Sequence, residues 1–313
     1  MIYTVTLNPA VDREYVVPKL IANTVLRASE VHIDYGGKGF NVSRMLTALG
    51  VRNTALGFVG SNAGAFLEKG MASLGIATDF VHIAHETRTN TTIVETDGHD
   101  HYKVNESGPA IADADREKLI EKVKHLAKAD DCWVLAGSLP PGIPANFYRE
   151  LTSIIQSAGA RAVLDTSGEA LLEGVKAHPY LIKPNVFEAG TLTGIKGKMH
   201  EDLLKMLKNI HAGGVEHVVI SAGKDASFFT SGESVLFAQP PMIEESNPVG
   251  AGDAMLAGLL YGLHQGLDHV ESFAWGIAAG SAAASKTGTG MPSMDEVQTL
   301  KKKIKVEEIE NAI

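Results

Sequence analysis

The chain has 313 residues, 44% of them hydrophobic, which is long enough for one large or two smaller α/β domains with a sizeable core. Its 28 basic and 37 acidic residues give a net charge of −9, which argues against nucleic-acid binding because that depends on basic patches. Cys132 is the only cysteine, so an intrachain disulfide is excluded, and no signal peptide or apolar run of about 18 residues is found. We therefore expect a cytoplasmic protein that does not enter a membrane.

Along most of the chain, apolar runs typical of strands alternate with patterns typical of helices. IYTVTL at residues 2–7 comes first, and later runs such as WVLAG, AVLD and VVISAG are apolar at consecutive positions, which favours parallel strands covered on both faces. Residues 115–129 show the i, i+3, i+4, i+7 spacing of an amphipathic helix. Further helices are predicted at residues 39–50, 63–75, 201–214 and 254–266, from about Pro144, from Val186, and in the tightly packed Ala/Gly-rich segment 276–285. This alternation predicts a doubly wound sheet.

Two separate stretches break the alternation. Residues 12–35 and 88–105 alternate polar and apolar side chains between turn signals, so we expect short strands that pair into one small lid sheet over an active-site mouth. The remaining residues, 1–11, 36–87 and 106–313, would form the large α/β domain.

The C-terminal third holds two further predicted elements. Residues 225–241 predict a hairpin with its turn at Ser231 and Gly232. Residues 293–313 predict a single amphipathic helix.

The segment NPVGAGD, residues 247–253, stands directly before a helical pattern of small and apolar residues. Gly250, Ala251 and Gly252 leave the backbone bare, and the first amides of a helix have no partner within it, so the segment favours an anion site. A carboxylate at Asp253, inside such a site, indicates a chemical role. The alternative is a glycine-rich turn in which Asp253 is only the helix N-cap.

Polar and glycine residues follow the other predicted strands as well, at the edge of a parallel sheet where ligands bind. The segment GGKGFN, residues 36–41, opens a second helix with two glycines, a lysine and an asparagine. Later strands are followed by Ser138, Lys183, Asn185, Glu188, Ser221 and Gly223. Each residue alone has a structural alternative, such as a turn glycine, a surface lysine or a first-turn helix acid, but the positions converge on one edge.

The ordered set GGKGFN, KPNVFE and NPVGAGD resembles the ribokinase-like carbohydrate kinases of the PfkB family over essentially the whole chain. TLNPAVD, ETRTNTTIVE, NESGPAI, GSLPPGIP and LDTSGEAL are most similar to the branch that phosphorylates hexose monophosphates. The resemblance implies a three-layer α/β/α fold with a β lid, and ATP-dependent conversion of a hexose monophosphate to a hexose 1,6-bisphosphate. Fructose 1-phosphate is the expected substrate, with tagatose 6-phosphate and fructose 6-phosphate as alternatives.

The resemblance also implies roles for the acceptor side of the site. Asp253 would take the proton of the attacking hydroxyl, while the amides of residues 250–252 hold the charge on the phosphoryl oxygens. Asp12 and Asn41 would bind sugar hydroxyls, with the backbone of Gly36 and Gly37 close to the sugar. The expected ligands of the substrate phosphate are Lys38, Arg88, Ser138 and Arg27, of which Arg27 could reach in from a partner subunit.

On the nucleotide side, Asn185 and Glu188 match the family's N-x-x-E motif, which organises Mg²⁺ and its waters beside the phosphates of ATP. The remaining residues implied along the nucleotide are Lys183, Ser221, Gly223 and Gly288. Relatives often bind a monovalent cation near the loop that here reads SKTGTG. The Lys286 ammonium could replace that ion, or it could point to solvent.

Other functions fit the sequence less well. A kinase of an unphosphorylated sugar or a nucleoside would not need the cations Lys38, Arg88 and Arg27 near the lid. A non-catalytic sensor of sugar phosphates could lose Asp253 and Glu188, and an oxidoreductase would carry G-x-G-x-x-G after the first strand. The unpaired edges of a small exposed sheet predict a homodimer through the lid.

Overall fold

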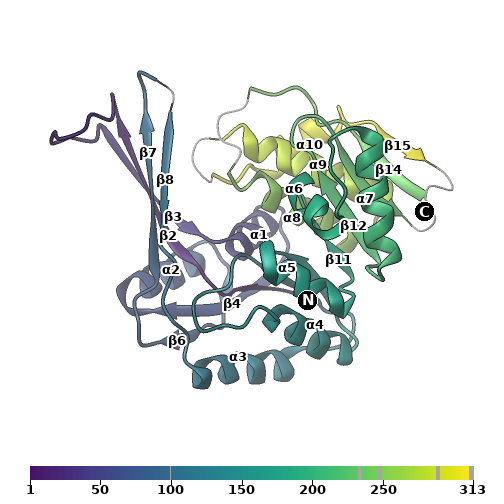
Figure 1. The fold of residues 1–313 in the computed structure, drawn as a ribbon, viewed down its shortest axis with the longest axis horizontal. Helices are drawn as coiled ribbons and strands as arrows, with labels where there is room; N and C mark the ends of the chain where they lie inside the picture. The colour runs from purple at the N-terminus through teal and green to yellow at the C-terminus, as the bar shows by residue number, and fades with distance from the viewer. Residues whose placement is uncertain (99, 232–233, 245–248, 287–289, 310–313) are drawn as a thin grey trace.

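The computed structural model describes residues 1–98, 100–231, 234–244, 249–286 and 290–309. Its main feature is an 11-stranded sheet with strand order β15-β14-β13-β12-β11-β10-β9-β1-β4-β5, in which β6 also pairs with β4. A four-stranded sheet, ordered β3-β2-β7-β8, projects beside it (Figure 1).

The large sheet is mostly parallel. Its strands are β1 (Ile2–Thr6), β4 (Asn53–Gly60), β5 (Ala77–Thr78), β6 (Val81–Ile83), β9 (Cys132–Ala136), β10 (Arg161–Asp165), β11 (Leu181–Ile182), β12 (His217–Ser221), β13 (Ser227–Ser231), β14 (Ser234–Ala238) and β15 (Val306–Ile309). Strands β13, β14 and β15 pair antiparallel, whereas the pairs from β5 to β12 are parallel. The predicted doubly wound, mostly parallel sheet is confirmed.

Helices cover both faces of the large sheet. They are α1 (Lys38–Ala48), α2 (Ser61–Ser73), α3 (Asp113–Leu126), α4 (Phe147–Ser157), α5 (Gly168–Gly174), α6 (Val186–Thr193), α7 (His200–Ala212), α8 (Ala251–His264), α9 (His269–Ala284) and α10 (Met294–Lys301), with a short 3-10 helix at Val175–Ala177. None of the helices in the described part of the chain combines the length and apolar character that a membrane crossing requires.

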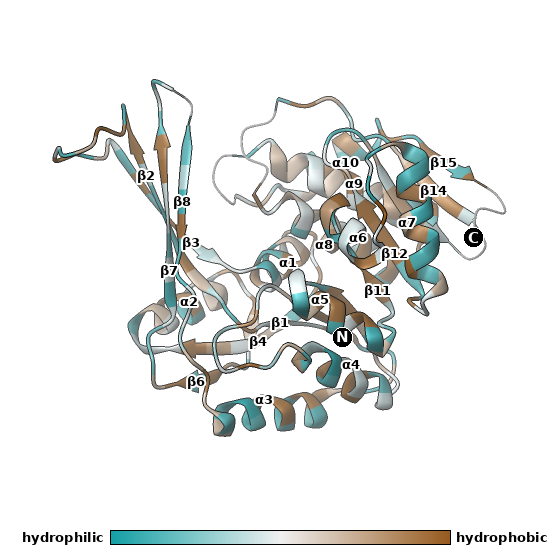
Figure 2. Cartoon of the chain, viewed as in Figure 1, coloured by the Kyte–Doolittle hydropathy of each residue, from teal (hydrophilic) through white to brown (hydrophobic). Residues whose placement is uncertain are grey.

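The strands contribute side chains to two hydrophobic cores, because successive side chains of a strand point to opposite faces of the sheet. In β9, Trp133 and Leu135 pack into a core with α3, α4, α5 and α7, whereas Val134 and Ala136 pack into a second core with α1, α8, α9 and α10. Figure 2 shows the hydrophobic strands between helices that are hydrophilic on their outer sides. This arrangement explains the continuous apolar strands and confirms the three-layer fold.

Helices α8 and α9 pack closely through glycines. A Cβ atom at Gly258 of α8 would lie 2.5 Å from the carbonyl oxygen of Trp275, and one at Gly280 of α9 would lie 3.0 Å from the carbonyl oxygen of Ala251. Any larger side chain at these positions would force the helices apart. Helix α9 therefore supports the first turn of α8, as the small-residue pattern at 276–285 predicts.

The small sheet is the lid. It joins the two predicted stretches as β2 (Ala10–Val17), β3 (Glu30–Gly36), β7 (Arg88–Glu95) and β8 (His101–Asn105). Asp12 of β2 stands opposite Asn90 of β7, and Asn90 stands opposite Asn105 of β8. One face of the lid is therefore polar, and the other carries the exposed apolar side chains Val31, Ile33, Tyr102 and Val104.

Two local predictions need correction. Residues 293–313 do not form one helix, since α10 ends at Lys301 and Val306–Ile309 form the edge strand β15 beside β14. The open edge of β14 offers backbone partners, and Ile304 and Val306 pack against the core, so tertiary contacts override the helical pattern. The helix expected from about Pro144 begins at Phe147, and β5 and β6 were not predicted.

The predicted hairpin is present as β13 and β14, which pair antiparallel from Ser227 opposite Ala238 to Ser231 opposite Ser234. Gly232, expected in its turn, lies outside the described residues.

Candidate active site

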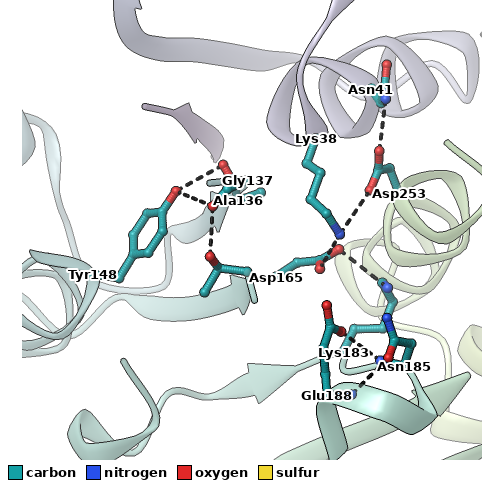
Figure 3. Close-up of polar contacts among 11 residues, drawn as sticks. Lys38, Asn41, Ala136, Gly137, Tyr148, Asp165, Lys183, Asn185, Glu188 and Asp253 are labelled. Atoms are coloured by element: carbon teal, nitrogen blue, oxygen red, sulfur yellow. Dashed lines mark hydrogen bonds and ion pairs between the residues drawn. The ribbon is translucent and has the colours of Figure 1, made fainter. Parts of the chain in front are cut away.

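Side chains from four elements meet at the carboxyl edge of the large sheet (Figure 3). Lys38 and Asn41 come from the first turn of α1, and Asp253 comes from the first turn of α8. Asp165 is the last residue of β10, and Lys183 follows β11 directly. The convergence follows from the parallel sheet, because the carboxyl ends of its strands and the N-termini of the following helices share one edge.

Asp253 is not the N-cap of α8. Gly250 occupies that position in a left-handed conformation with φ of 81°, and Asp253 is the third helical residue. Asp253 is 6% exposed, and its Oδ2 accepts a hydrogen bond of 2.8 Å from Asn41 Nδ2. The carboxylate therefore points across the site toward α1, and the capping alternative is wrong.

The surroundings of Asp253 suit a proton acceptor. Burial raises the pKa of this carboxyl, and the negative charge of Asp165 raises it further, while the Lys38 ammonium opposes both effects. Lys38 Nζ lies 3.8 Å from Asp253 Oδ1. A carboxylate with a raised pKa is a stronger base than an ordinary aspartate, as general-base catalysis requires.

Asp165 is a part of the site that the sequence interpretation did not identify. Its side chain is fully buried, with Lys38 Nζ 2.8 Å from Oδ1 and Lys183 Nζ 3.4 Å from Oδ2. Burial would raise the pKa of this carboxyl, but the ammonium groups of Lys183 and Lys38 outweigh burial and hold the pKa below its ordinary value. The signal was present, since Asp165 ends the run AVLD at the ligand-binding edge of the sheet.

The Lys183 ammonium lies against the bare first turn of α8. A Cβ atom at Gly252 would be 3.2 Å from Lys183 Nζ, so the lysine approaches the backbone of this glycine closely. Lys183 is 5% exposed. A buried positive charge therefore stands beside the amides that the sequence predicts as an anion site.

The polar face of the lid brings Asp12 to the site. Asp12 Oδ1 accepts a hydrogen bond of 2.8 Å from Asn90 Nδ2, and burial raises the pKa of the Asp12 carboxyl. A Cβ atom at Gly36 would lie 2.3 Å from Asp12 Oδ2, so a glycine is required there. Asn90 is a second residue that the sequence interpretation assigned no role.

The four expected phosphate ligands do not gather in one place. Lys38 is paired with Asp165, while the Arg88 guanidinium donates to the carbonyl oxygens of Asn8 and Glu106 at 2.9 and 2.8 Å. The Ser138 hydroxyl accepts from Asn8 Nδ2 at 3.3 Å, so Ser138 and Arg88 both contact Asn8.

Arg27 is exposed in the connection between β2 and β3, at the end of the lid away from the large sheet (Figure 1). Within one chain, the fold does not bring Arg27 to the other three residues.

Asn185 and Glu188 form a capping box at the start of α6. Asn185 Oδ1 accepts from the Glu188 amide, and Glu188 Oε2 accepts from the Asn185 amide, both at 2.9 Å. The first-turn helical role of Glu188 is therefore real, and it occupies only one carboxylate oxygen. Within the described residues, no group of three or more acidic, histidine or cysteine side chains could by itself hold a metal ion.

A largely apolar pocket opens beside the first turn of α8. Gly223, Pro240, Ile243, Ala251, Ile277 and Ala284 are among its lining residues. Ser221 ends β12 next to this region and is bridged to Asn185 through the backbone. Because Ala251 and Gly252 line it, the pocket borders the predicted anion site. Gly288, also expected here, lies outside the described residues.

Lys286 does not simply point to solvent. Its side chain is one-third exposed, and its ammonium donates to the Glu296 carboxylate, which also accepts from the Ser293 amide at the start of α10. The pair ties the end of α9 to α10. The described contacts thus give Lys286 a structural partner, and its relation to a monovalent cation remains a prediction.

The protein is a phosphotransferase of the ribokinase-like class. Its defining features are a three-layer fold, a bare helix N-terminus, a buried acceptor carboxylate and a polar lid. Residues 5–296 match the model of the pfkB family carbohydrate kinases, and the chain belongs to this family.

Named relatives cover nearly the whole chain. The 1-phosphofructokinase of Borreliella burgdorferi is 36% identical in an alignment 313 positions long that covers 99% of this chain and 99% of that protein. The D-tagatose-1-phosphate kinase of Bacillus licheniformis is 35% identical over 93% of this chain and 94% of that protein. Phosphofructokinase-2 from Escherichia coli, solved in complex with potassium, superposes with a TM-score of 0.91 and 29% identity over 96% of this chain and 98% of that one. The predicted family, fold and sugar-phosphate kinase class are confirmed.

Proposed function

We propose that the protein transfers the γ-phosphoryl group of ATP to the 6-hydroxyl of fructose 1-phosphate, giving fructose 1,6-bisphosphate. The observation that carries the proposal is the buried Asp253 carboxylate beside the bare amides of α8, held by Asn41 at 2.8 Å. The similarity to 1-phosphofructokinases over the whole chain supports the choice of substrate.

In this proposal, Asp253 accepts the proton of the attacking hydroxyl as the new O–P bond forms. The amides of the first turn of α8 and the Lys183 ammonium face the phosphoryl oxygens, where negative charge collects during transfer. These groups are fixed by the helix and by Asp165, so little reorganisation is needed during the reaction. The nucleotide would lie along Ser221 and Gly223 into the apolar pocket.

The donor set suits Mg²⁺, which binds proteins through one or two carboxylates and keeps several waters. Glu188 has one carboxylate oxygen engaged by the Asn185 amide, which leaves the other for a metal-bound water or the metal itself. When bound, Mg²⁺ would neutralise charge on the ATP phosphates. The use of ATP and the single cysteine fit a cytoplasmic enzyme.

The acceptor would bind under the polar face of the lid. Asp12 and Asn90, already hydrogen-bonded to each other, present oxygen and amide groups that suit sugar hydroxyls. Arg88 and Ser138, which both contact Asn8, are the proposed ligands of the substrate phosphate. Arginine suits this task because its planar donors match phosphate oxygens.

Tagatose 1-phosphate is a second candidate substrate, because a kinase named for it is 35% identical to this chain. It differs from fructose 1-phosphate at one stereocentre, so a single lid contact could decide between the two sugars.

The test is ATP consumption with Mg²⁺ against fructose 1-phosphate, tagatose 1-phosphate, tagatose 6-phosphate, fructose 6-phosphate, fructose, ribose and adenosine. The expected result is the highest kcat/KM with fructose 1-phosphate. A preference for another hexose phosphate would replace the substrate, and activity only on unphosphorylated acceptors would overturn the proposal.

We further propose that the enzyme is a homodimer through the apolar face of the lid. Val31, Ile33, Tyr102 and Val104 are 50%, 46%, 41% and 65% exposed on this one face, and exposed apolar patches of this kind mark interaction sites. A face-to-face contact would cover these side chains and could carry Arg27 toward the partner's site.

The substitution Ile33→Asp tests the dimer. It should convert a dimer to a monomer by light scattering, while His32→Asp on the polar face of the same strand should leave the dimer intact. A monomeric wild-type protein at micromolar concentration would contradict this part of the proposal.

A further inference from the structure

The Lys38 ammonium lies between two carboxylates at unequal distances. It is 2.8 Å from Asp165 Oδ1 and 3.8 Å from Asp253 Oδ1 (Figure 3). The first distance is a charge-assisted hydrogen bond, and the second is an ion pair without direct hydrogen-bond contact. Asp165 therefore takes the direct contact that Asp253 would otherwise receive.

The same carboxylate holds a second ammonium. Lys183 Nζ lies 3.4 Å from Asp165 Oδ2 and close to the backbone of Gly252. Asp165 is itself 1% exposed and Lys183 is 5% exposed, so this pair is little weakened by water, whereas the Lys38 side chain is 38% exposed. One buried carboxylate thus fixes one cation beside the proton acceptor and another beside the anion site.

We propose that Asp165 is a positioning residue that keeps the Lys38 ammonium off Asp253, so that the Asp253 carboxylate stays open to the substrate hydroxyl. This inference rests on the proposed kinase function. It assigns Asp165 no contact with substrate, since it acts through Lys38 and, for the anion site, through Lys183.

The physical reason is competition between two buried carboxylates for one ammonium. Asp165 and Asp253 are 1% and 6% exposed, whereas the Lys38 side chain is 38% exposed, and a buried carboxylate needs a cationic partner because an unpaired buried charge is costly. If Asp165 loses its charge, Asp253, at 3.8 Å, is the other carboxylate in ion-pair distance of Lys38 among the described residues. Lys38 would then turn to Asp253, occupy the oxygen that accepts the substrate proton and weaken the base.

The loss of Asp165 also changes the charges that face Asp253. Among the described residues those charges are Lys38, Lys183 and Asp165, and of these three Asp165 alone raises the Asp253 pKa. In an Asp165→Asn variant the Asp253 pKa should fall, both because a like charge is gone and because Lys38 moves closer. The acidic limb of the pH profile of kcat should therefore move to lower pH.

The test is the Asp165→Asn variant, which keeps the side-chain shape and removes the charge. We expect kcat to fall about 100-fold, within the range for general-base catalysis, with the KM for the sugar phosphate changed less than threefold. A crystal structure of the variant should show Lys38 Nζ within hydrogen-bond distance of Asp253. Wild-type kcat, or an unmoved acidic limb with Lys38 still away from Asp253, would overturn the inference.

A double-mutant cycle with Lys38→Met shows whether Asp165 acts through Lys38. In the Lys38→Met background, Asp165→Asn should cost less than tenfold in kcat, because Lys38 is no longer present to block the base. If the losses of kcat in the two single variants multiply to give the loss in the double variant, Asp165 does not act through Lys38.

Asp131→Asn is the matched control for loss of a buried acid. Asp131 is 7% exposed, lies at the opposite end of β9 and pairs with the chain's N-terminus, so its loss should lower stability without moving the acidic limb. The outcomes also separate this inference from the proposed function. An inactive wild-type enzyme refutes the function, whereas an active wild type with an equally active Asp165→Asn variant refutes only the role of Asp165.

Discussion

The carboxyl edge of the large sheet and the lid sheet both present charged groups to the same site, but they hold them differently. At the sheet edge, Asp165, Lys183 and Asp253 are 1%, 5% and 6% exposed and pair with one another or with Lys38 and Asn41. On the polar face of the lid, His32 and Lys103 are exposed to solvent. Electrostatic interactions are strong and geometrically fixed in the first region and screened in the second.

This difference separates chemistry from recognition. The buried cluster is preorganised by α1, α8 and the strand ends, so it can stabilise a transition state without rearranging. The lid has a polar face with few buried contacts, so it can adapt to a sugar and change its specificity at small cost in stability. Substitutions in the two regions should therefore affect different measured quantities.

The largest effect is expected from Asp253→Asn. Loss of the proton acceptor should lower kcat about 1,000-fold, which corresponds to about 4 kcal/mol of activation free energy. The variant should be as stable as the wild type or more stable, because removing this buried charge ends its repulsion with Asp165. Steady-state kinetics with thermal unfolding tests this, and a near-normal kcat would remove Asp253 from the base role.

The second-largest effect is expected where α9 packs against α8, the helix that carries Asp253. Gly258→Leu places a side chain where a Cβ would already be 2.5 Å from the Trp275 carbonyl oxygen, so it should lower the free energy of unfolding by about 3 kcal/mol and reduce kcat. Lys69→Leu, on the exposed side of α2, is the control and should change stability by less than about 0.5 kcal/mol. Urea unfolding measures both, and equal stability of the two variants would show that α8 and α9 can separate freely.

A third prediction concerns His217, a buried titratable group in the large domain away from the lid. Its side chain is 7% exposed, and burial, with a smaller contribution from His269, lowers its pKa to about 4. Arg161 and His211 also lower the pKa, while the backbone carbonyl of Thr230 opposes them.

The unfolded chain binds a proton at this histidine near pH 6.5, whereas the folded chain does so only near pH 4. The contribution of His217 to the free energy of unfolding is therefore fully present above pH 6.5. It is lost as the pH falls toward 4, by about 2–3 kcal/mol. The variant His217→Leu should show a correspondingly shallower pH dependence of the free energy of unfolding. Parallel curves for the two proteins would contradict this account.

The smallest effect is expected on the lid. Asn90→Ala removes the amide that donates to Asp12 at 2.8 Å, so the KM for the sugar phosphate should rise about tenfold, or about 1.4 kcal/mol. The melting temperature and the KM for ATP should change little. A large loss of stability in this variant would break the distinction between the two regions, because the lid would then be part of the structural core.

The sequence predicted an element correctly where the local residue pattern and the order of strands and helices along the chain both indicate that element. Consecutive apolar residues in WVLAG and VVISAG predicted buried parallel strands, and glycines before Asp253 predicted a bare helix N-terminus. Prediction failed at residues 306–309, because an edge strand forms only where β14 leaves backbone groups open. That edge belongs to another part of the chain and leaves no mark in the local pattern.

Within the site, the sequence alone determined which residue types stand at the carboxyl edge, since strand order and periodicity place them there whatever their partners. Only the tertiary structure decided how those residues pair. Lys38 was expected at the substrate phosphate but contacts Asp165, 127 residues away in the chain. Such pairing depends on which helix N-termini face one another across the sheet and on which charges are shielded from water, and neither can be read from local sequence.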